Sequence, residues 1–398
     1  MTASSPYKLK GWRLRKKWTL QQMADTLHDS GFKISKQALG LFEKGKTHPK
    51  AATLRAIASV FGVRPHELMQ TDFELQFIGF RSLASLSKTH RERIQSIMSW
   101  RAEKRETLVA ASGSIRNDWS MDQYSVTTVD QADEIALIVR EKWDLGFGGI
   151  QSLADNIEKN GGEVIEISDD TRFSGLSAYS SDGRPYIAVQ HRNEDGARQR
   201  MDMAHELAHL ILDTDSPVDE EQFAHRFAGA FLLTRDNVTS ELGHHRRDLN
   251  LQELKALKLK YGVSIQAWVR RAKDVGVISE TTYRNLCFRI GRAGLRSNEG
   301  HPFVQPEPLD RDFRLAARAI TEKGLSPQEA ASLASVPPEA FEEPLPITET
   351  ISLKTNPRTL SRKERRELAK KGAALTAESY QASPENILPD LAEVFEDQ

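Results

Sequence analysis

The chain has 398 residues, a length that predicts two to three domains, each with a sizeable hydrophobic core. Its net charge of −1 hides an asymmetry, because residues 1–70 carry thirteen Lys and Arg against four Asp and Glu, a net of +9, and the remainder carries −10. No apolar run approaches the roughly 18 residues of a membrane span, and the N-terminus lacks a signal-peptide pattern. We therefore expect a soluble, cytoplasmic protein without a membrane partner.

The basic N-terminal segment, residues 1–72, has the pattern of five short helices separated by turn and cap residues. The predicted helices are 7–16, 20–27, 36–43, 52–61 and 65–69. Thr19 and Ser35 stand directly before two of them, where a hydroxyl caps the unpaired N–H groups of a helix. Five phased helices in a basic segment favour a DNA-binding module. The alternative is a module that makes only protein contacts.

Three stretches of this segment resemble the XRE-type, lambda-repressor-like helix-turn-helix: 20–24 (LQQMA), 34–37 (ISKQ) and 42–49 (FEKGKTHP). The resemblance implies that the third helix enters the major groove of double-stranded DNA. Lys36 and Gln37 lie at the N-terminal end of that helix, where Lys suits guanine and Gln suits adenine. Lys44, Lys46 and Thr47 follow in the loop, where we expect contacts to phosphates.

Residues 73–129 predict a helical linker. Helices are expected at 80–86 and 89–108, and a polar segment follows at 111–128. The charges on 89–108 indicate a solvated face or a dimer surface, and we expect a homodimer.

Residues 130–295 predict a second domain that begins with mixed elements. Amphipathic helices are expected at 130–143 and 150–159, and strands at 164–167, 175–179 and 185–190, with a hairpin turn at 181–183. We interpret 186–190 as an exposed edge strand that binds an extended substrate by backbone pairing. An ordinary half-buried strand is the alternative.

The pentapeptide His205-Glu206-Leu207-Ala208-His209 follows in a segment with helical apolar spacing. An H-E-x-x-H sequence on a helix places two imidazoles one turn apart on the same face, where both can ligate one Zn²⁺. Glu206 does not ligate the metal but can take a proton from water, as a general base. The pentapeptide therefore predicts a zinc hydrolase.

A second helix, expected from residue 218 onward, offers a third ligand from Glu220, Glu221 or His225. We choose Glu221, because it shares a helix face with His225, whereas Glu220 is rotated from it by about 100°. His225 is the alternative ligand, or a residue that orients one.

At this point the chain resembles the ImmA/IrrE family of metallopeptidases, whose pattern is HELGH followed by ExxANxFA and a Leu-rich run. The matching stretches are 205–209 (HELAH), 221–228 (EQFAHRFA) and 231–233 (FLL). The resemblance covers about residues 130 to 290. It implies a zincin-like domain in which His205, His209 and Glu221 ligate zinc and Glu206 is the general base. Ala208 and His225 depart from the family's Gly and Asn.

Residues 296–398 predict a helical, partly flexible C-terminal region. Helices are expected at 312–323, 326–334 and 338–341, before a Pro/Thr-rich stretch (344–357), a basic stretch (358–371) and an acidic one (372–398).

Together these patterns predict a mainly α fold with a small β-sheet (α+β), in a regulator that binds DNA and carries a zinc endopeptidase. The family resemblance implies a repressor or a toxin/antitoxin partner as substrate, cut after stress, and self-cleavage is open as well. The alternative is a non-catalytic transcription factor or antitoxin whose zinc domain is a sensor or binds a partner. Glu206, which a structural zinc site does not need, favours the peptidase.

Overall fold

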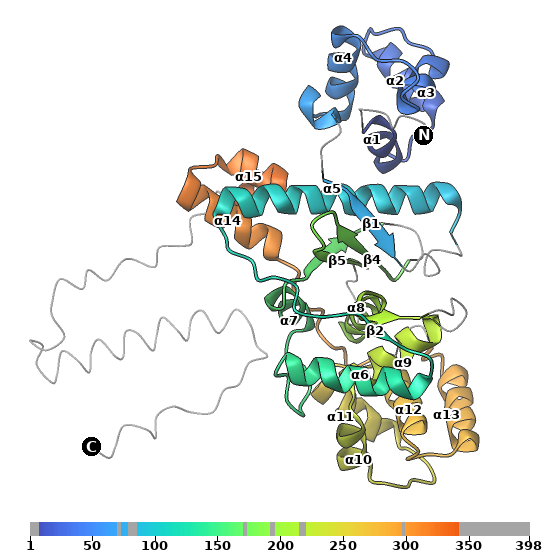
Figure 1. Cartoon of the computed structure of the whole chain (residues 1–398). Helices are drawn as coiled ribbons and strands as arrows, with labels where there is room; N and C mark the ends of the chain where they lie inside the picture. Colours follow the sequence, from blue (N-terminus) through green and yellow to red (C-terminus); the bar gives the residue numbers. More distant parts are fainter. Residues whose placement is uncertain are drawn as a thin grey trace, which may run out of the picture. The chain divides into compact units, whose positions relative to one another are not determined.

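The computed structural model describes residues 8–69, 73–78, 86–169, 173–191, 196–214, 220–296 and 299–341. Helices dominate these ranges, and the β-structure is limited to a four-stranded and a two-stranded sheet (Figure 1). The predicted α+β fold class is confirmed. None of the described helices has both the length and the apolar character that a bilayer crossing requires.

The N-terminal bundle contains the five predicted helices. They are α1 (Leu9–Arg15), α2 (Leu20–Asp29), α3 (Lys36–Glu43), α4 (Ala51–Phe61) and the 3₁₀-helix η1 (Pro65–Leu68). Thr19 and Ser35 cap α2 and α3 as predicted, since their hydroxyl oxygens accept hydrogen bonds from the backbone N–H groups of Gln22 and Ala38. The helices enclose a small apolar core that includes Leu9, Met23, Leu27, Leu39 and Ile57.

A single long helix, α5 (Lys88–Ser112), packs against α1 of this bundle. The guanidinium of Arg15 lies 3.8 Å over the Trp12 ring, and Trp12 meets Trp100 of α5 edge to face at 6.0 Å. Lys8 pairs with Glu103 at the same interface. The bundle therefore uses α1 for the contact to α5. The predicted helix 80–86 lies almost wholly outside the described residues.

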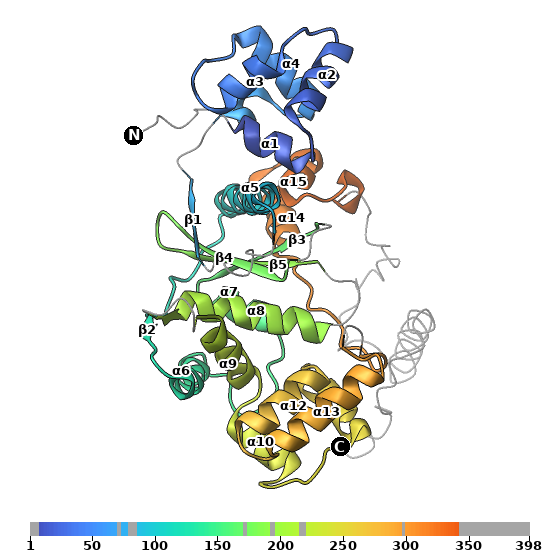
Figure 2. The ribbon, with the colours of Figure 1, turned by 90° about the vertical axis from the view of Figure 1, so that its right-hand side faces the viewer.

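The four-stranded sheet has the order β1 (Leu75–Ile78), β4 (Gly175–Ser180), β5 (Pro185–Gln190) and β3 (Glu163–Ile167). β4 is antiparallel to both of its neighbours, and β3 is parallel to β5. Figure 2 shows the sheet as a layer between α5 on one side and α7 (Leu153–Lys159) and α8 (Gly196–Ile211) on the other. Side chains alternate accordingly: Leu176 and Ala178 join the core under α5, whereas Ser177 reaches α8.

The expected edge strand of this sheet is wrong. Residues 186–190 are not an exposed edge strand, because β5 is paired with β4 on one side and β3 on the other, and its residues 185–189 are buried. Such a nearly continuous apolar run belongs to a strand that is covered on both faces. Residues 75–78, for which the sequence predicts no strand, form β1 of this sheet.

The other face of α8 packs on α9 (Glu220–Leu232), which in turn packs on α6 (Val129–Lys142). Leu207, Phe227 and Phe231 are fully buried in the largest apolar core of the chain. The short strands β2 (Tyr124–Ser125) and β6 (Leu212–Asp213) pair in parallel beside it. Four further helices complete this region: α10 (Arg235–Leu242), α11 (Leu251–Tyr261), α12 (Ile265–Asp274) and α13 (Glu280–Arg292).

The C-terminal helices have the predicted positions, as α14 (Arg311–Lys323), α15 (Pro327–Ala334) and the 3₁₀-helix η2 (Pro338–Phe341). Both α14 and α15 pack on α5. Arg105 of α5 is fully buried there and bonds Asp312 of α14, Glu163 of β3 at 2.6 Å and the carbonyl oxygen of Val164 at 3.1 Å. This one guanidinium therefore ties three elements together. The predicted stretches 344–398 lie outside the described residues.

Candidate metal centre and nucleic-acid interface

His205, Glu206 and His209 are buried residues of helix α8. No Gly or Pro interrupts residues 197–211, and the apolar residues at three- and four-residue spacing bury the helix between the sheet and α9. The Nε2 atoms of His205 and His209 lie 3.2 Å apart, as the one-turn spacing predicts. Both imidazoles thus point at the same space beside α9.

Glu221 of α9 completes the cluster. Its two carboxylate oxygens lie 3.3 Å from Nε2 of His205 and 3.7 Å from Nε2 of His209. In the described residues, His205, His209 and Glu221 form a cluster whose ligand atoms lie close enough together to bind one metal ion. The structure therefore brings together the three residues that the sequence selected as ligands.

The donor set fits a tetrahedral zinc ion. Ligand atoms about 2.0–2.1 Å from a tetrahedral metal are separated from each other by about 3.3 Å, close to the separations of 3.2, 3.3 and 3.7 Å in this cluster. Oε1 of Glu221 is buried, and within the described residues it accepts no hydrogen bond. The hydrogen bond from His205 lowers the pKa of Glu221, so the carboxylate is in the charged form that a cation needs.

Glu220 holds the other side of His209, a contact that the sequence did not predict. Its Oε1 lies 3.0 Å from Nδ1 of His209. Burial opposes the charged form of His209, but the hydrogen bond to Glu220 and the nearby carboxylates prevail and raise its pKa. A carboxylate on Nδ1 leaves Nε2 directed at the cluster. The rotation of Glu220 away from Glu221 on the helix, which argued against it as a ligand, is what brings it to this second nitrogen.

Glu206 lies beneath strand β4. Ser177 Oγ donates a hydrogen bond of 2.6 Å to Oε2 of Glu206, while Oε1 has no hydrogen-bond partner in the described part of the chain. A side chain at Gly175 does not fit, because a Cβ there would come within 2.5 Å of Cγ of Glu206. Burial raises the pKa of Glu206, which makes its carboxylate a stronger base. Neither Gly175 nor Ser177 carried a recognisable signal in the sequence.

His225 lies beside the cluster but is not part of its three-ligand group. Its ring centroid is 4.4 Å from that of His205. Burial, with a contribution from His205, lowers the pKa of His225 to about 4, so that this ring is neutral at pH 7.

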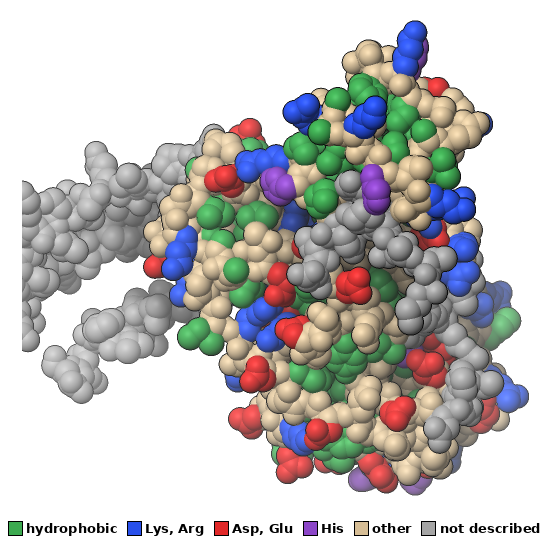
Figure 3. All heavy atoms as spheres, turned by 45° about the horizontal axis from the view of Figure 1, so that its top comes forward, with side chains coloured by type: hydrophobic (Ala, Val, Ile, Leu, Met, Phe, Trp, Pro, Cys, Tyr) green, Lys and Arg blue, Asp and Glu red, His purple; other side chains and the backbone are tan. Residues whose placement is uncertain are grey.

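The residues selected for DNA contact lie at the two ends of α3. Lys36 and Gln37 occupy the first turn of α3, and Lys44, Lys46 and Thr47 follow its C-terminal end; all five are exposed. Figure 3 shows more Lys and Arg than Asp and Glu side chains over the visible face of the bundle. Because α1 makes the contact to α5, α3 is accessible to a partner.

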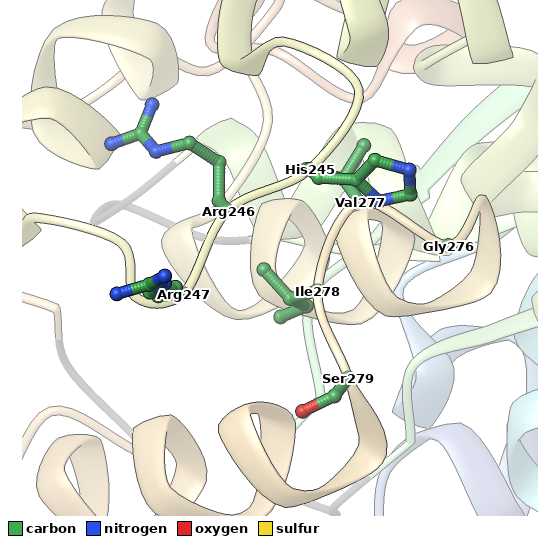
Figure 4. A pocket seen from close by; sticks show the side chains of 7 residues that line it. All are labelled: His245, Arg246, Arg247, Gly276, Val277, Ile278 and Ser279. Carbon is green, nitrogen blue, oxygen red and sulfur yellow. The ribbon is translucent and has the colours of Figure 1, made fainter.

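A pocket of about 390 Å³ lies elsewhere, between the α10–α11 loop and the segment that joins α12 to α13. In Figure 4 the side chains of Arg246 and Arg247 extend away from Ile278. No residue of the candidate metal or DNA sites lines this pocket, so we assign it no part in their chemistry. Its lining is His245, Arg246, Arg247, Gly276, Val277, Ile278 and Ser279.

Comparison with known families supports both halves of this description. Residues 9–68 match the helix-turn-helix family model, and residues 158–273 match the model of a peptidase family described as the IrrE N-terminal-like domain. The second match includes His205, Glu206, His209 and Glu221. The chain thus combines a helix-turn-helix domain with an IrrE N-terminal-like, metallopeptidase-like domain, and the predicted fusion is confirmed. No curated protein matches the chain.

Proposed function

We propose that the protein is a DNA-binding transcriptional regulator whose second domain is a zinc-dependent endopeptidase. The observation that carries this proposal is the convergence of His205, His209 and Glu221 beside Glu206, whose second oxygen is unpartnered within the described residues. The proposed substrate is a repressor-like or antitoxin-like protein, or the chain itself, cut in response to stress or in a mobile-element or defence context. We propose action in the cytoplasm as a homodimer on an operator.

His205, His209 and Glu221 would hold the ion, and Glu220 would keep His209 in the orientation that binds it. A bound Zn²⁺ supplies Lewis acidity, which lowers the pKa of water and polarises a peptide carbonyl. Glu206 then serves as the proton carrier. Ser177 fixes its Oε2, so Oε1 accepts the proton of the attacking water and afterwards returns it to the leaving amine.

The second candidate function, a metal-dependent sensor without catalysis, uses the same three ligands. It gives no role to a buried carboxylate that is oriented by Ser177 and left with one oxygen unpartnered in the described residues. Burying such a group costs free energy that a purely structural site need not spend. Glu206 therefore favours the peptidase.

Glu206→Gln separates the two functions. The amide has nearly the same shape but cannot accept the proton, so we expect zinc content and DNA binding to stay unchanged while cleavage of the substrate falls about 10²- to 10⁴-fold. The measurement is the appearance of a shortened partner, or a shortened form of the chain, on immunoblots of stressed cells that express either variant with its neighbouring genes. Equal regulation in both strains without any cleavage product would support the sensor.

The DNA half has its own test in the full-length chain. Lys36→Ala should cost about 1–3 kcal/mol of discrimination between a selected operator and a mutated one, because Lys36 is assigned to a base edge. Lys46→Ala should weaken binding to all sequences alike and reduce the salt slope by about 1, because it is assigned to a phosphate. Fluorescence anisotropy at several salt concentrations measures both. Lys10→Ala is the control, since Lys10 pairs with Glu92 of α5; an equal effect of Lys10→Ala would contradict the assignment.

A further inference from the structure

Strand β1 pairs with β4, the strand from which Ser177 and Gly175 approach Glu206 of the candidate centre. It pairs antiparallel with β4, with Leu75 opposite Ser180 and Ile78 opposite Ser177. β5 occupies the opposite side of β4. In the described part of the chain the sheet ends at β1. Between Ser177 and Ser180, both sides of β4 are therefore paired, one of them by a segment that follows the N-terminal bundle in sequence.

β4 is also the strand that touches the proton carrier. Ser177 bonds Glu206, and Gly175 lies against it without a side chain between them. A peptide that is bound by backbone pairing and reaches Glu206 has to add to β4, because extended peptides bind exposed strand edges in this way. β5 blocks one side permanently, since it is buried between β4 and β3. The side that remains for a peptide is the side that β1 occupies.

The side chains of β1 show what this position accepts. Leu75 and Phe77 pack into the core under α5, and Ile78 lies on the opposite face of the sheet, where Ser177 meets Glu206. Gln76 is exposed. An extended segment with apolar residues at alternate positions therefore fits the edge.

β1 is the strand of this sheet that is most easily displaced. It has four residues, and its burial is partial at Leu75, Phe77 and Ile78, whereas nearly all residues of β3, β4 and β5 are buried. Short edge strands with few buried contacts open at a lower free-energy cost than the core strands around them. Exchange of β1 for another strand leaves the rest of the sheet paired.

We propose that the β1-binding side of β4 is the peptide-docking edge of this centre, and that β1 is its intramolecular occupant. A substrate segment must displace β1, so the chain is latent while β1 stays paired. This inference rests on the proposed peptidase function for its consequence, but the exchange of strands is a binding event that can be measured without cleavage.

The test uses a fluorescein-labelled peptide with the sequence of residues 73–78, FELQFI, and the full-length chain with Glu206→Gln, so that the probe is not consumed. Phe77→Cys with Ala178→Cys adds a redox lock. These residues are directly opposite, on the face away from Glu206, at a Cα separation that suits a disulfide. We expect no peptide binding by anisotropy in the oxidised form and binding in the reduced form. The single change Phe77→Cys is the matched control and should show no redox response.

A second variant opens the edge. Leu75→Ser with Phe77→Ser removes the apolar contacts of β1 and should strengthen peptide binding about tenfold or more, because a tethered competitor has a high effective concentration. Gln76→Ala, on the same strand but exposed, should change nothing. Equal binding by the oxidised and reduced lock overturns the proposal. If the opened variant loses its circular dichroism, the lock still decides, since it compares one polypeptide in two redox states.

The outcomes also separate this inference from the peptidase function. If peptide binding depends on the redox state of the lock but no Glu206-dependent cleavage is found, the docking edge is supported and the peptidase function is rejected. If cleavage depends on Glu206 but peptide binding is the same in the oxidised and reduced lock, the peptidase function is supported and the proposed role of β1 is rejected.

Discussion

His209→Ala should abolish zinc binding by the full-length chain, which we expect to hold about one equivalent of Zn²⁺ in its wild-type form. The substitution removes one of three ligand atoms that converge within 3.7 Å, and leaves an imidazole and a carboxylate that cannot define a tetrahedral site alone. Metal content after dialysis, and competition with a chromophoric chelator, measure the loss. Retention of a full equivalent at unchanged affinity would show that the ion is held elsewhere.

The neighbours of the cluster provide graded controls. Glu221→Ala should resemble His209→Ala, since both remove a ligand. Glu220→Gln should weaken zinc binding only about 10- to 100-fold, because Glu220 acts through Nδ1 of His209. His225→Ala should have the smallest effect, because His225 lies beside the His205 ring and outside the three-ligand group. If His225→Ala destroys binding while Glu221→Ala preserves it, the assignment of the third ligand is wrong.

The sequence predicted this cluster because its parts are local. Two candidate ligands and the proposed general base lie within five residues of one helix, so helical periodicity alone predicts their arrangement. The prediction of Glu221 needed only one further assumption, that the next helix packs against α8. The contact of Glu220 was not predicted. Helical angles were used to find residues that face the metal, whereas Glu220 contacts Nδ1 of His209, the ring nitrogen that points away from the metal site. Ser177 and Gly175 escaped because they approach Glu206 from a strand about thirty residues earlier in the sequence.

The sheet shows the same limit more strongly. Residues 163–190 contain the strands where the sequence predicts them, yet their lateral order depends on pairings with residues far away. A four-residue strand such as β1 has too short a pattern to be distinguished from helix or loop. The pairing of β1 with β4 is found only in the folded structure. It moves the proposed substrate-binding strand from β5 to β4.

Contrary to the sequence prediction, the charged residues of α5 are not all on a solvated surface. In the sequence they indicate a solvated or dimer surface, but Arg105 is 1% exposed and its guanidinium is shared by Asp312, Glu163 and Glu158. The segment 311–323 supplies Asp312 from more than two hundred residues away, and no local pattern marks such a pair. This ion cluster joins α14 to β3 of the sheet that carries the candidate site.

Arg105→Met should therefore destabilise the fold by about 3–5 kcal/mol, the typical cost of removing one partner from a buried ion pair. Methionine fills most of the volume but removes the nearest cation of the buried carboxylates of Asp312 and Glu163. What remains are longer contacts, from Arg101 to Asp312 at 3.6 Å and from Arg116 and Arg311 to Glu163 at 3.3 and 3.5 Å. The shift of the urea unfolding midpoint, followed by circular dichroism, measures the loss. Arg314→Met on α14 is the control. The side chain of Arg314 is 55% exposed and pairs with Asp155 and Asp310, so the change should cost less than about 1 kcal/mol. Equal midpoints for the two variants would show that the buried cluster does not hold α14 in place; a large difference would show that the stability of the sheet above the metal centre depends on a helix outside the family-matched segment.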